Sequence, residues 1–291
     1  MKITMLGTGN ALVTECYNTC FIIEDNGQYF MVDGGGGNAV LTQIKHAGYD
    51  WMDMRHIFVT HKHVDHLLGI VWMIRMICQF MDHGEYKGEA FIYSHKEVLG
   101  LLKGMAEDLL QKKEYDFIGK RLHLVEVSDG ETIDIIGHKV TFFDIQSTKA
   151  KQFGFCMDMG DGKKLTCCGD EPYNECERRY AENSEWLLHE AFCLYSQRDI
   201  FDPYEKHHST VKDACELAEG LHVKNLLLYH TEDKTIKERK KLYIDEGKQY
   251  FYGNIFVPYD LETVSLYILI YLNNHTFQDC HTAVLFVISF A

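Results

Sequence analysis

The stretch THKHVDH, residues 60–66, contains three histidines and one aspartate within seven positions. An apolar run at 57–59 precedes it and is typical of a buried strand. A proline-free apolar segment at 67–78 follows it and favours a helix. The polar residues therefore lie on a predicted strand-to-helix loop, where side chains of one short segment can converge on a common point.

Two pairs of side chains in this loop are suited to bind metal ions. Residues two apart on an extended segment point the same way, so His61 and His63 can bind one ion. Asp65 and His66 lie on the first helical turn and can bind a second ion. Imidazole and carboxylate ligands together favour zinc, or manganese and iron where carboxylates dominate. A histidine-rich loop can also be plain polar surface, but the aspartate and the strand-loop-helix context favour a metal site.

The spacing HxHxDH resembles the signature of the metallo-β-lactamase superfamily. The resemblance implies an α/β (α+β) fold in which two sheets pack face to face between outer helices, a four-layer αββα sandwich. It also implies that later strands supply the remaining ligands of a site for two divalent metal ions.

The order of the predicted elements agrees with this architecture. Two passes of strands followed by helices fit two sheets with helices outside, and we assign residues 1–266 to a single metallo-hydrolase domain. Four glycines follow Asp33 and would let the backbone approach the metal loop closely. The predicted strands are 2–6, 20–24, 28–33, 57–59, 90–94, 122–127, 131–136, 139–145, 152–159, 164–168, 185–190 and 225–230, and the predicted helices are 38–48, 67–78, 96–112, 210–221 and 233–248.

Composition limits the partners of the protein. The chain of 291 residues has 29 basic and 43 acidic side chains and a formal charge of -14, so its surface as a whole repels nucleic acid. Ten cysteines follow no repeated spacing, and the first residues, MKITMLG, lack the apolar core of a signal peptide. We therefore expect reduced thiols and a cytoplasmic location.

The last residues, 267–291, form an apolar C-terminal extension to which the sequence assigns no role. Two apolar runs in it are separated by polar residues, and neither approaches the ~20 residues that span a bilayer. We expect no membrane partner.

Two later strands end in residues that can bind metal. The apolar run 165–168 stops at Gly169-Asp170, and an aspartate there can bridge two cations. The apolar run 226–229 stops at His230, which becomes the expected last ligand. A single histidine at a strand end can equally be structural. The interpretation of His230 as a ligand therefore depends on the metal-binding pattern of the loop at 60–66.

Two further motifs narrow the resemblance to the ribonuclease Z branch of the superfamily. These are His-Glu-Ala at 189–191 and His-Ser-Thr at 208–210. The resemblance implies that Glu190 and His208 form a proton relay beside the metals. A carboxylate can orient an imidazole and raise its basicity, which suits the protonation of a leaving oxygen. The alternative is that Ser209 or Thr210 merely caps the following helix.

The sequence departs from the ribonuclease Z pattern in two places. That branch has another histidine ligand ahead of a Gly-aromatic pair, whereas the matching stretch here, 144–155, has no histidine. Gln146 could offer a weak carbonyl ligand, which suits a harder ion than zinc. Bacterial ribonuclease Z also carries a long arm that clamps tRNA, and the short span between Gln146 and Asp170 cannot hold one.

The sequence therefore predicts a metal-dependent hydrolase, a ribonuclease Z-like phosphodiesterase. A hydroxide bridging two divalent ions, zinc first and manganese or iron second, would attack phosphorus. The predicted substrate is a small phosphodiester or RNA, and the resemblance implies a homodimer. The predicted catalytic residues are Asp65, Glu190 and His208, and the predicted metal ligands are His61, His63, Asp65, His66, Asp170 and His230, with Gln146 as a weak one.

Two other functions stay open at this point. The same fold and hydroxide would serve a hydrolase of another ester, a thioester or a lactone. A non-catalytic module that binds metal or nucleotide is the second alternative, and the missing histidine near Gln146 is the feature that favours it.

Overall fold

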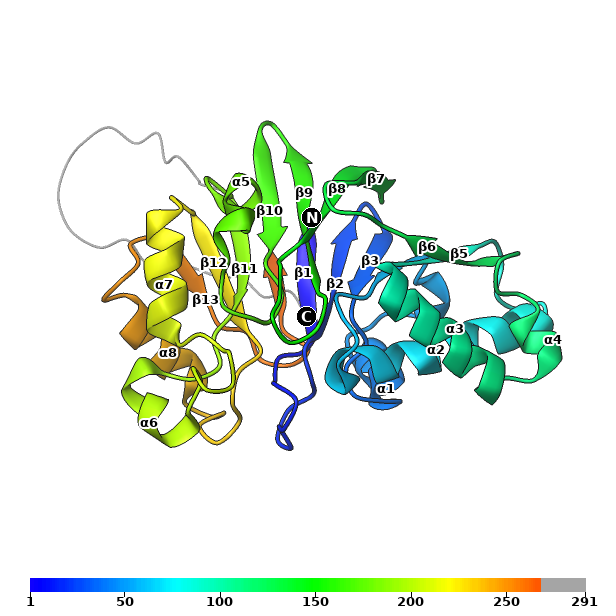
Figure 1. Ribbon diagram of the computed structural model, residues 1–291, viewed down its shortest axis with the longest axis horizontal. Coiled ribbons are helices and arrows are strands. Elements are labelled where there is room, and N and C mark those ends of the chain that lie inside the picture. Colours follow the sequence, from blue (N-terminus) through cyan, green and yellow to red (C-terminus); the bar gives the residue numbers. More distant parts are fainter. Residues whose placement is uncertain (268–291) are drawn as a thin grey trace, which may run out of the picture.

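The computed structural model describes residues 1–267 and consists of two sheets packed face to face (Figure 1). Apart from Tyr267, the expected C-terminal extension lies outside the described residues. The first sheet has the order β14-β1-β2-β3-β4-β5-β6 and the second β13-β12-β11-β10-β9-β8-β7. The strands are β1 Lys2–Gly7, β2 Cys20–Asp25, β3 Gln28–Val32, β4 His56–Phe58, β5 Ala90–Ser94, β6 Leu122–Glu126, β7 Thr132–Ile135, β8 His138–Asp144, β9 Phe153–Gly160, β10 Lys163–Cys167, β11 Trp186–Glu190, β12 Asn225–Tyr229, β13 Asn254–Phe256 and β14 Thr263–Ser265.

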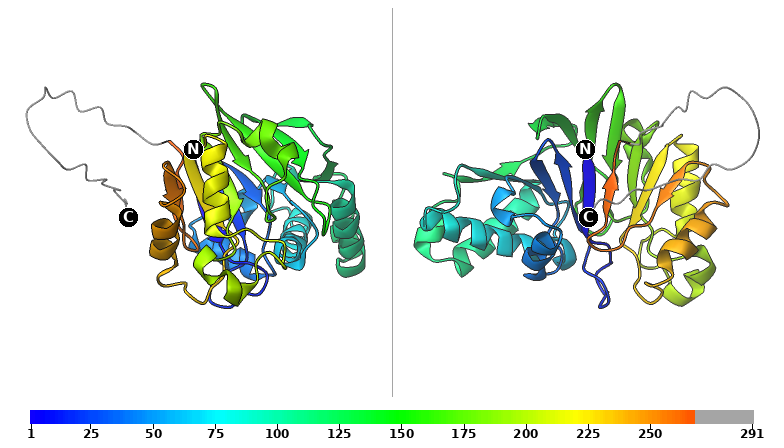
Figure 2. Two further views of the ribbon diagram at one scale, coloured as in Figure 1. Left: turned by 60° about the vertical axis from the view of Figure 1, so that its left-hand side comes forward. Right: turned by 180° about the vertical axis from the view of Figure 1, so that it is seen from behind.

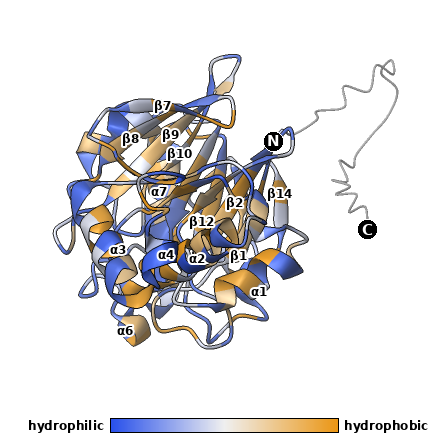
Figure 3. Ribbon diagram, turned by 90° about the vertical axis from the view of Figure 1, so that its right-hand side faces the viewer, coloured by the Kyte–Doolittle hydropathy of each residue, from blue (hydrophilic) through white to orange (hydrophobic). Residues whose placement is uncertain are grey.

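Helices cover the outer face of each sheet, which confirms the predicted αββα sandwich (Figure 1). Figure 3 shows hydrophobic strands inside and helices that carry both hydrophobic and hydrophilic residues. Helices α1 to α4 lie on the first sheet, and α7 and α8 lie on the second. The helices are α1 Ala39–His46, α2 Val64–Asp82, α3 Lys96–Leu109, α4 Lys112–Tyr115, α5 Arg178–Ala181, α6 Arg198–Phe201, α7 Val211–Gly220 and α8 Arg239–Gly247, with short 3₁₀ turns at Trp51–Asp53, Glu175–Glu177 and Tyr195–Gln197.

Aromatic side chains from both sheets fill the space between them. Phe58 of β4 lies 4.8 Å from Phe142 of β8, and Phe30 of β3 lies 5.5 Å from Phe155 of β9, measured between ring centroids. All four are fully buried. Large rings at offset or edge-on geometry bury much apolar area per residue, so this layer supplies a large part of the burial that holds the sheets together.

Parallel pairing fixes where the functional loops lie. Strands β3, β4, β5 and β6 run parallel in the first sheet, and β10, β11, β12 and β13 run parallel in the second. The carboxyl ends of parallel neighbours meet at one edge of a sheet, so the loops after β10, β11 and β12 gather at one edge of the second sheet. The loop after β4, in the first sheet, meets them there through His61 and Asp170. Antiparallel β1 and β14 lie side by side and join the two ends of the described chain (Figure 2).

One helix begins later than its sequence pattern predicts. The segment 233–248 was expected to be helical throughout, whereas α8 begins at Arg239. The Glu232 carboxylate accepts hydrogen bonds from the backbone N–H groups of Lys234 and Thr235. Such local bonds compete with the helical ladder, and they hold residues 233–238 in turns.

Helix α2 is long and apolar enough to cross a membrane by length and composition alone. More than half of its apolar window is buried inside the fold, which is the pattern of a core helix. Its first turn lies against the glycines that follow Asp33. Gly34 N–H donates to the His66 carbonyl at 2.9 Å, and Gly69 N–H donates to the Gly35 carbonyl at 2.9 Å.

This close approach predicts a strong dependence on Gly69. A Cβ added at Gly69 would lie 1.8 Å from the Gly34 carbonyl oxygen, which cannot move aside like a side chain. We expect Gly69→Ala to lower the free energy of unfolding by roughly 1–3 kcal/mol. Urea denaturation followed by circular dichroism measures the change.

The matched control is Gly104→Ala, in the interior of α3, where nothing lies within 4 Å of the added Cβ. This change should stabilise the protein by about 0.5–1 kcal/mol, because alanine favours a helix over glycine. Equal effects of the two substitutions would contradict the packing described for α2.

Candidate metal centre

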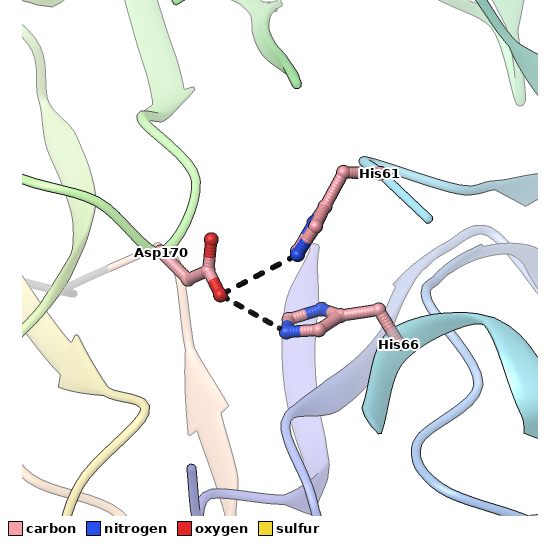
Figure 4. A group of neighbouring side chains, drawn as sticks. All are labelled: His61, His66 and Asp170. Atoms are coloured by element: carbon pink, nitrogen blue, oxygen red, sulfur yellow. Dashed lines mark ion pairs between the residues drawn. The ribbon is translucent and has the colours of Figure 1, made fainter. Parts of the chain in front are cut away.

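A single oxygen of Asp170 faces three imidazole rings. Its Oδ2 lies 3.6 Å from His61 Nε2, 3.2 Å from His66 Nε2 and 3.3 Å from His230 Nε2. Figure 4 shows the first two of these contacts. Asp170 follows β10, His230 follows β12, and the other two histidines lie on either side of the start of α2, so three chain segments meet at this atom.

The remaining residues of the predicted site lie around the same point. Asp65 Oδ2 lies 3.3 Å from His66 Nε2 and 3.4 Å from His230 Nε2. His63 Nδ1 lies 2.8 Å from His61 Nε2. The structure thus brings together all six residues that the sequence singled out as strong ligands. His66 belongs to two groups of potential ligands. One group also contains His61 and Asp170, and the other also contains Asp65 and His230.

Asp33 is a site residue that the sequence argument missed. Its Oδ2 accepts a hydrogen bond from His66 Nδ1 at 2.7 Å, and its two oxygens accept from Thr60 N–H and Thr60 Oγ1, each at 2.8 Å. Because that hydroxyl gives its hydrogen to Asp33, it accepts from His61 Nδ1 at 2.9 Å. Both histidines therefore carry a proton on Nδ1 and direct Nε2 into the site.

The charges of the centre suit divalent cations. Asp33, Asp65 and Asp170 are at most 4% exposed, and among residues 1–267 none of them forms an ion pair with lysine or arginine. Buried carboxylates without a cationic partner are costly. His66 Nε2 is buried and has no hydrogen-bond partner in the described chain. Imidazole and carboxylate donors in this arrangement bind divalent metal.

The protonation states of Asp170 and His61 also suit metal binding. Burial raises the pKa of Asp170, but His61, His66 and His230 lower it by more, so its pKa lies well below the usual range. Burial lowers the pKa of His61 well below that of free histidine. Burial also acts to lower the pKa of His66, but Asp65, with Asp33 and Asp170, raises it well above the usual value. An ionised Asp170 and a neutral His61 are the forms that coordinate metal.

A buried glutamine holds the other oxygen of Asp170. Gln152 Nε2 donates to Asp170 Oδ1 at 2.6 Å, which leaves Oδ2 free for the site. A Cβ at Gly169 would lie 2.6 Å from that same Gln152 nitrogen, so the contact requires glycine there. Gln146, the residue weighed as a weak ligand, has an exposed side chain, and its backbone N–H bonds Asp144 Oδ1 at 2.8 Å.

Glu190 and His208 adjoin the centre. His208 Nδ1 lies 3.5 Å from Glu190 Oε2, and ligand atoms of both lie within 4.8 Å of His230. Glu190 Oε1 accepts from Ser209 N–H. Burial lowers the pKa of His208, but Glu190 raises it by more, so the net shift is upward. Thr210 does cap α7, through Asp213, so the capping role and the site geometry coexist in this loop.

Fold and site together define a metal-dependent hydrolase with the metallo-β-lactamase fold, of the ribonuclease Z-like branch. A protein-family model described as anti-Pycsar protein Apyc1 matches residues 1–252, and the chain belongs to that family.

Individual relatives agree with this assignment. The chain is 25% identical to a ribonuclease Z of Archaeoglobus fulgidus over 87% of its own length and 94% of that protein. Its fold is similar to YhfI from Bacillus subtilis, with a TM-score of 0.73, 16% identity and coverage of 90% and 98% of the two chains. It is also similar to the short form of human tRNase Z, with a TM-score of 0.70, 19% identity and coverage of 92% and 100%.

The two glutamines of the loop between β8 and β9 give a matched test of the centre. Gln152→Leu should lower metal affinity by about 10–100-fold, because Asp170 loses the partner that orients it. Gln146→Leu should leave affinity unchanged. Competition with a chromophoric chelator measures both. A larger loss in Gln146→Leu would instead identify Gln146 as a ligand.

Proposed function

We propose that the protein hydrolyses phosphodiester bonds with two divalent metal ions, zinc in the first place. The observation that carries the proposal is Asp170 Oδ2, which faces three histidine nitrogens with the Glu190–His208 pair alongside. An imidazole-rich ligand set favours zinc, and the number of carboxylates makes manganese or iron the alternatives.

The six residues divide between two ions. His61, His63 and Asp170 would hold the first, and Asp65, His66, His230 and the same Asp170 would hold the second. When bound, two such ions lower the pKa of a water molecule toward ~7 and offset charge on the phosphoryl oxygens. Asp65, the third predicted catalytic residue, lies between His66 and His230 and fixes the position of both rings.

His208 would supply the proton to the leaving oxygen. Glu190 Oε2 faces His208 Nδ1, which directs Nε2 away from Glu190. The ring stacks on Phe192 with 4.9 Å between centroids and 8° between planes, so its orientation is fixed by packing as well as by charge. The raised pKa favours the protonated imidazole, which is the form that a general acid needs.

The substrate that we favour is a small phosphodiester. The formal charge of -14 opposes binding of long nucleic acid. The span between Gln146 and Asp170 consists of one loop and the β9–β10 hairpin. The relatives named ribonuclease Z support RNA as the second substrate class. A homodimer and a cytoplasmic location stay predictions from the sequence.

Comparison of substrates tests the proposed reaction. Protein loaded with zinc or manganese should hydrolyse bis(p-nitrophenyl) phosphate faster than a lactone or a thioester. Turnover of the lactone or thioester without turnover of the phosphodiester would assign the site to the other ester-hydrolase class. Fewer than one metal per chain, with no hydrolysis of any of them, would favour the non-catalytic module.

Two substitutions separate the proton donor from the metal ligands. His208→Ala should lower kcat by roughly 10²–10⁴-fold while both metals stay bound, because it removes only the proton supply. Asp170→Ala should lose metal. Elemental analysis and kinetics with bis(p-nitrophenyl) phosphate measure the two effects.

The control for these variants is His46→Ala, at the exposed end of α1, which should match the unmodified protein in both measurements. Loss of metal from His208→Ala would show that this histidine is a ligand. An unchanged kcat would remove it from the reaction.

A further inference from the structure

The loop between β8 and β9, residues 145–152, is attached to the metal centre at both ends. Ser147 Oγ donates to Glu171 Oε1 at 2.8 Å, and Gln152 Nε2 donates to Asp170 Oδ1 at 2.6 Å. Ser147 Oγ also accepts from the backbone N–H of Lys149 at 3.2 Å. Because two neighbouring carboxylates hold the loop, the position of its middle is coupled to that of Asp170.

Lys149, in the middle of this loop, reaches across to the segment that carries His208. Its Nζ donates to the carbonyl oxygen of His207 at 3.4 Å. The loop that precedes α7 and the loop that follows β8 therefore approach each other through this side chain. His207 adjoins His208, so the ammonium group of Lys149 lies one residue from the predicted proton donor.

Lys149 differs from the other lysines near the centre in its partner. Lys62 Nζ lies 2.5 Å from a Glu97 oxygen, and Lys151 Nζ lies 3.6 Å from an Asp144 oxygen. Within residues 1–267, Lys149 forms no ion pair with a carboxylate, and its one side-chain hydrogen bond is to a neutral carbonyl. Its charge is therefore available to a negatively charged ligand.

We propose that Lys149 is a substrate-binding residue whose ammonium group contacts a non-bridging oxygen of the phosphoryl group at the metal centre. The inference rests on the proposed phosphodiesterase function and adds a residue that none of the motifs assigns. A phosphodiester carries a negative charge, whereas the His207 carbonyl is neutral. Exchange of that carbonyl for a phosphoryl oxygen replaces an ordinary hydrogen bond with a charge-assisted one, which is stronger.

The location explains why a lysine would be needed there. The predicted ligands and Asp33 hold three buried carboxylates, and the chain as a whole carries a charge of -14. An anionic substrate approaching this face meets negative potential beyond the immediate reach of the metal ions. An ammonium at the His207 carbonyl, one residue from His208, offsets that potential beside the predicted proton donor.

The test is the binding of inorganic phosphate to the metal-loaded protein by isothermal titration calorimetry, which requires no turnover. Lys149→Met should weaken phosphate binding by about 10–100-fold, the range expected for a hydrogen bond between charged groups. Lys149→Arg should restore most of the affinity. With bis(p-nitrophenyl) phosphate, Lys149→Met should raise KM more than it lowers kcat.

The control is Lys163→Met, which removes the same charge at the start of β10, the end of that strand remote from Asp170. It should bind phosphate like the unmodified protein. Equal affinities of the Lys149→Met and Lys163→Met proteins, or no phosphate binding by the unmodified metal-loaded protein, would overturn the inference.

These outcomes are distinct from a failure of the proposed function. If the unmodified protein binds phosphate and Lys149→Met does not, but neither hydrolyses a phosphodiester, then Lys149 is an anion-binding residue of a centre with another reaction.

Discussion

The electrostatic constraint on which the structure depends is the burial of Asp33, Asp65 and Asp170 side by side. In the described part of the chain, the only ionisable groups that form ion pairs with these carboxylates are imidazoles. Removing such charges from water is costly unless a cation is bound or a histidine takes up a proton. The carboxylates accordingly raise the pKa of His66 above its usual value, against the effect of burial. Divalent ions would satisfy the same constraint with more charge.

The fold brings these groups together because the parallel strands of both sheets end on the same side of the sandwich. The segments after β4, β10, β11 and β12 are far apart in the sequence and contribute ligands or proton-transfer residues at one place. Close backbone contact between Gly34 and Gly69 then sets α2 against the end of β3, so that Asp33 can reach His66. The rigidity of the sandwich thus extends to the positions of individual ring nitrogens, which suits a centre that must be organised before substrate binds.

Both the sandwich and the metal-binding residues at its edge could be predicted from the sequence, because the sequence patterns that indicate them are local. The four potential ligands of the loop at 60–66 lie within six consecutive residues, and Asp170 and His230 each follow an apolar run. Asp33 and Gln152 were missed as site residues because they act through other side chains, and their partners are distant in the sequence.

The choice between Gln146 and Gln152 shows why such contacts escape sequence analysis. Both lie in one loop, and only the path of that loop over Gly169 determines that Gln152 is the one that reaches Asp170.

The central claim is that Asp170 Oδ2 is shared by two metal ions, and anomalous diffraction from crystals soaked in zinc tests it most directly. The account predicts two peaks about 3.5–4 Å apart, each within about 2.0–2.2 Å of an Asp170 oxygen. A single peak that Asp170 does not reach, or zinc bound only at surface histidines, would contradict it.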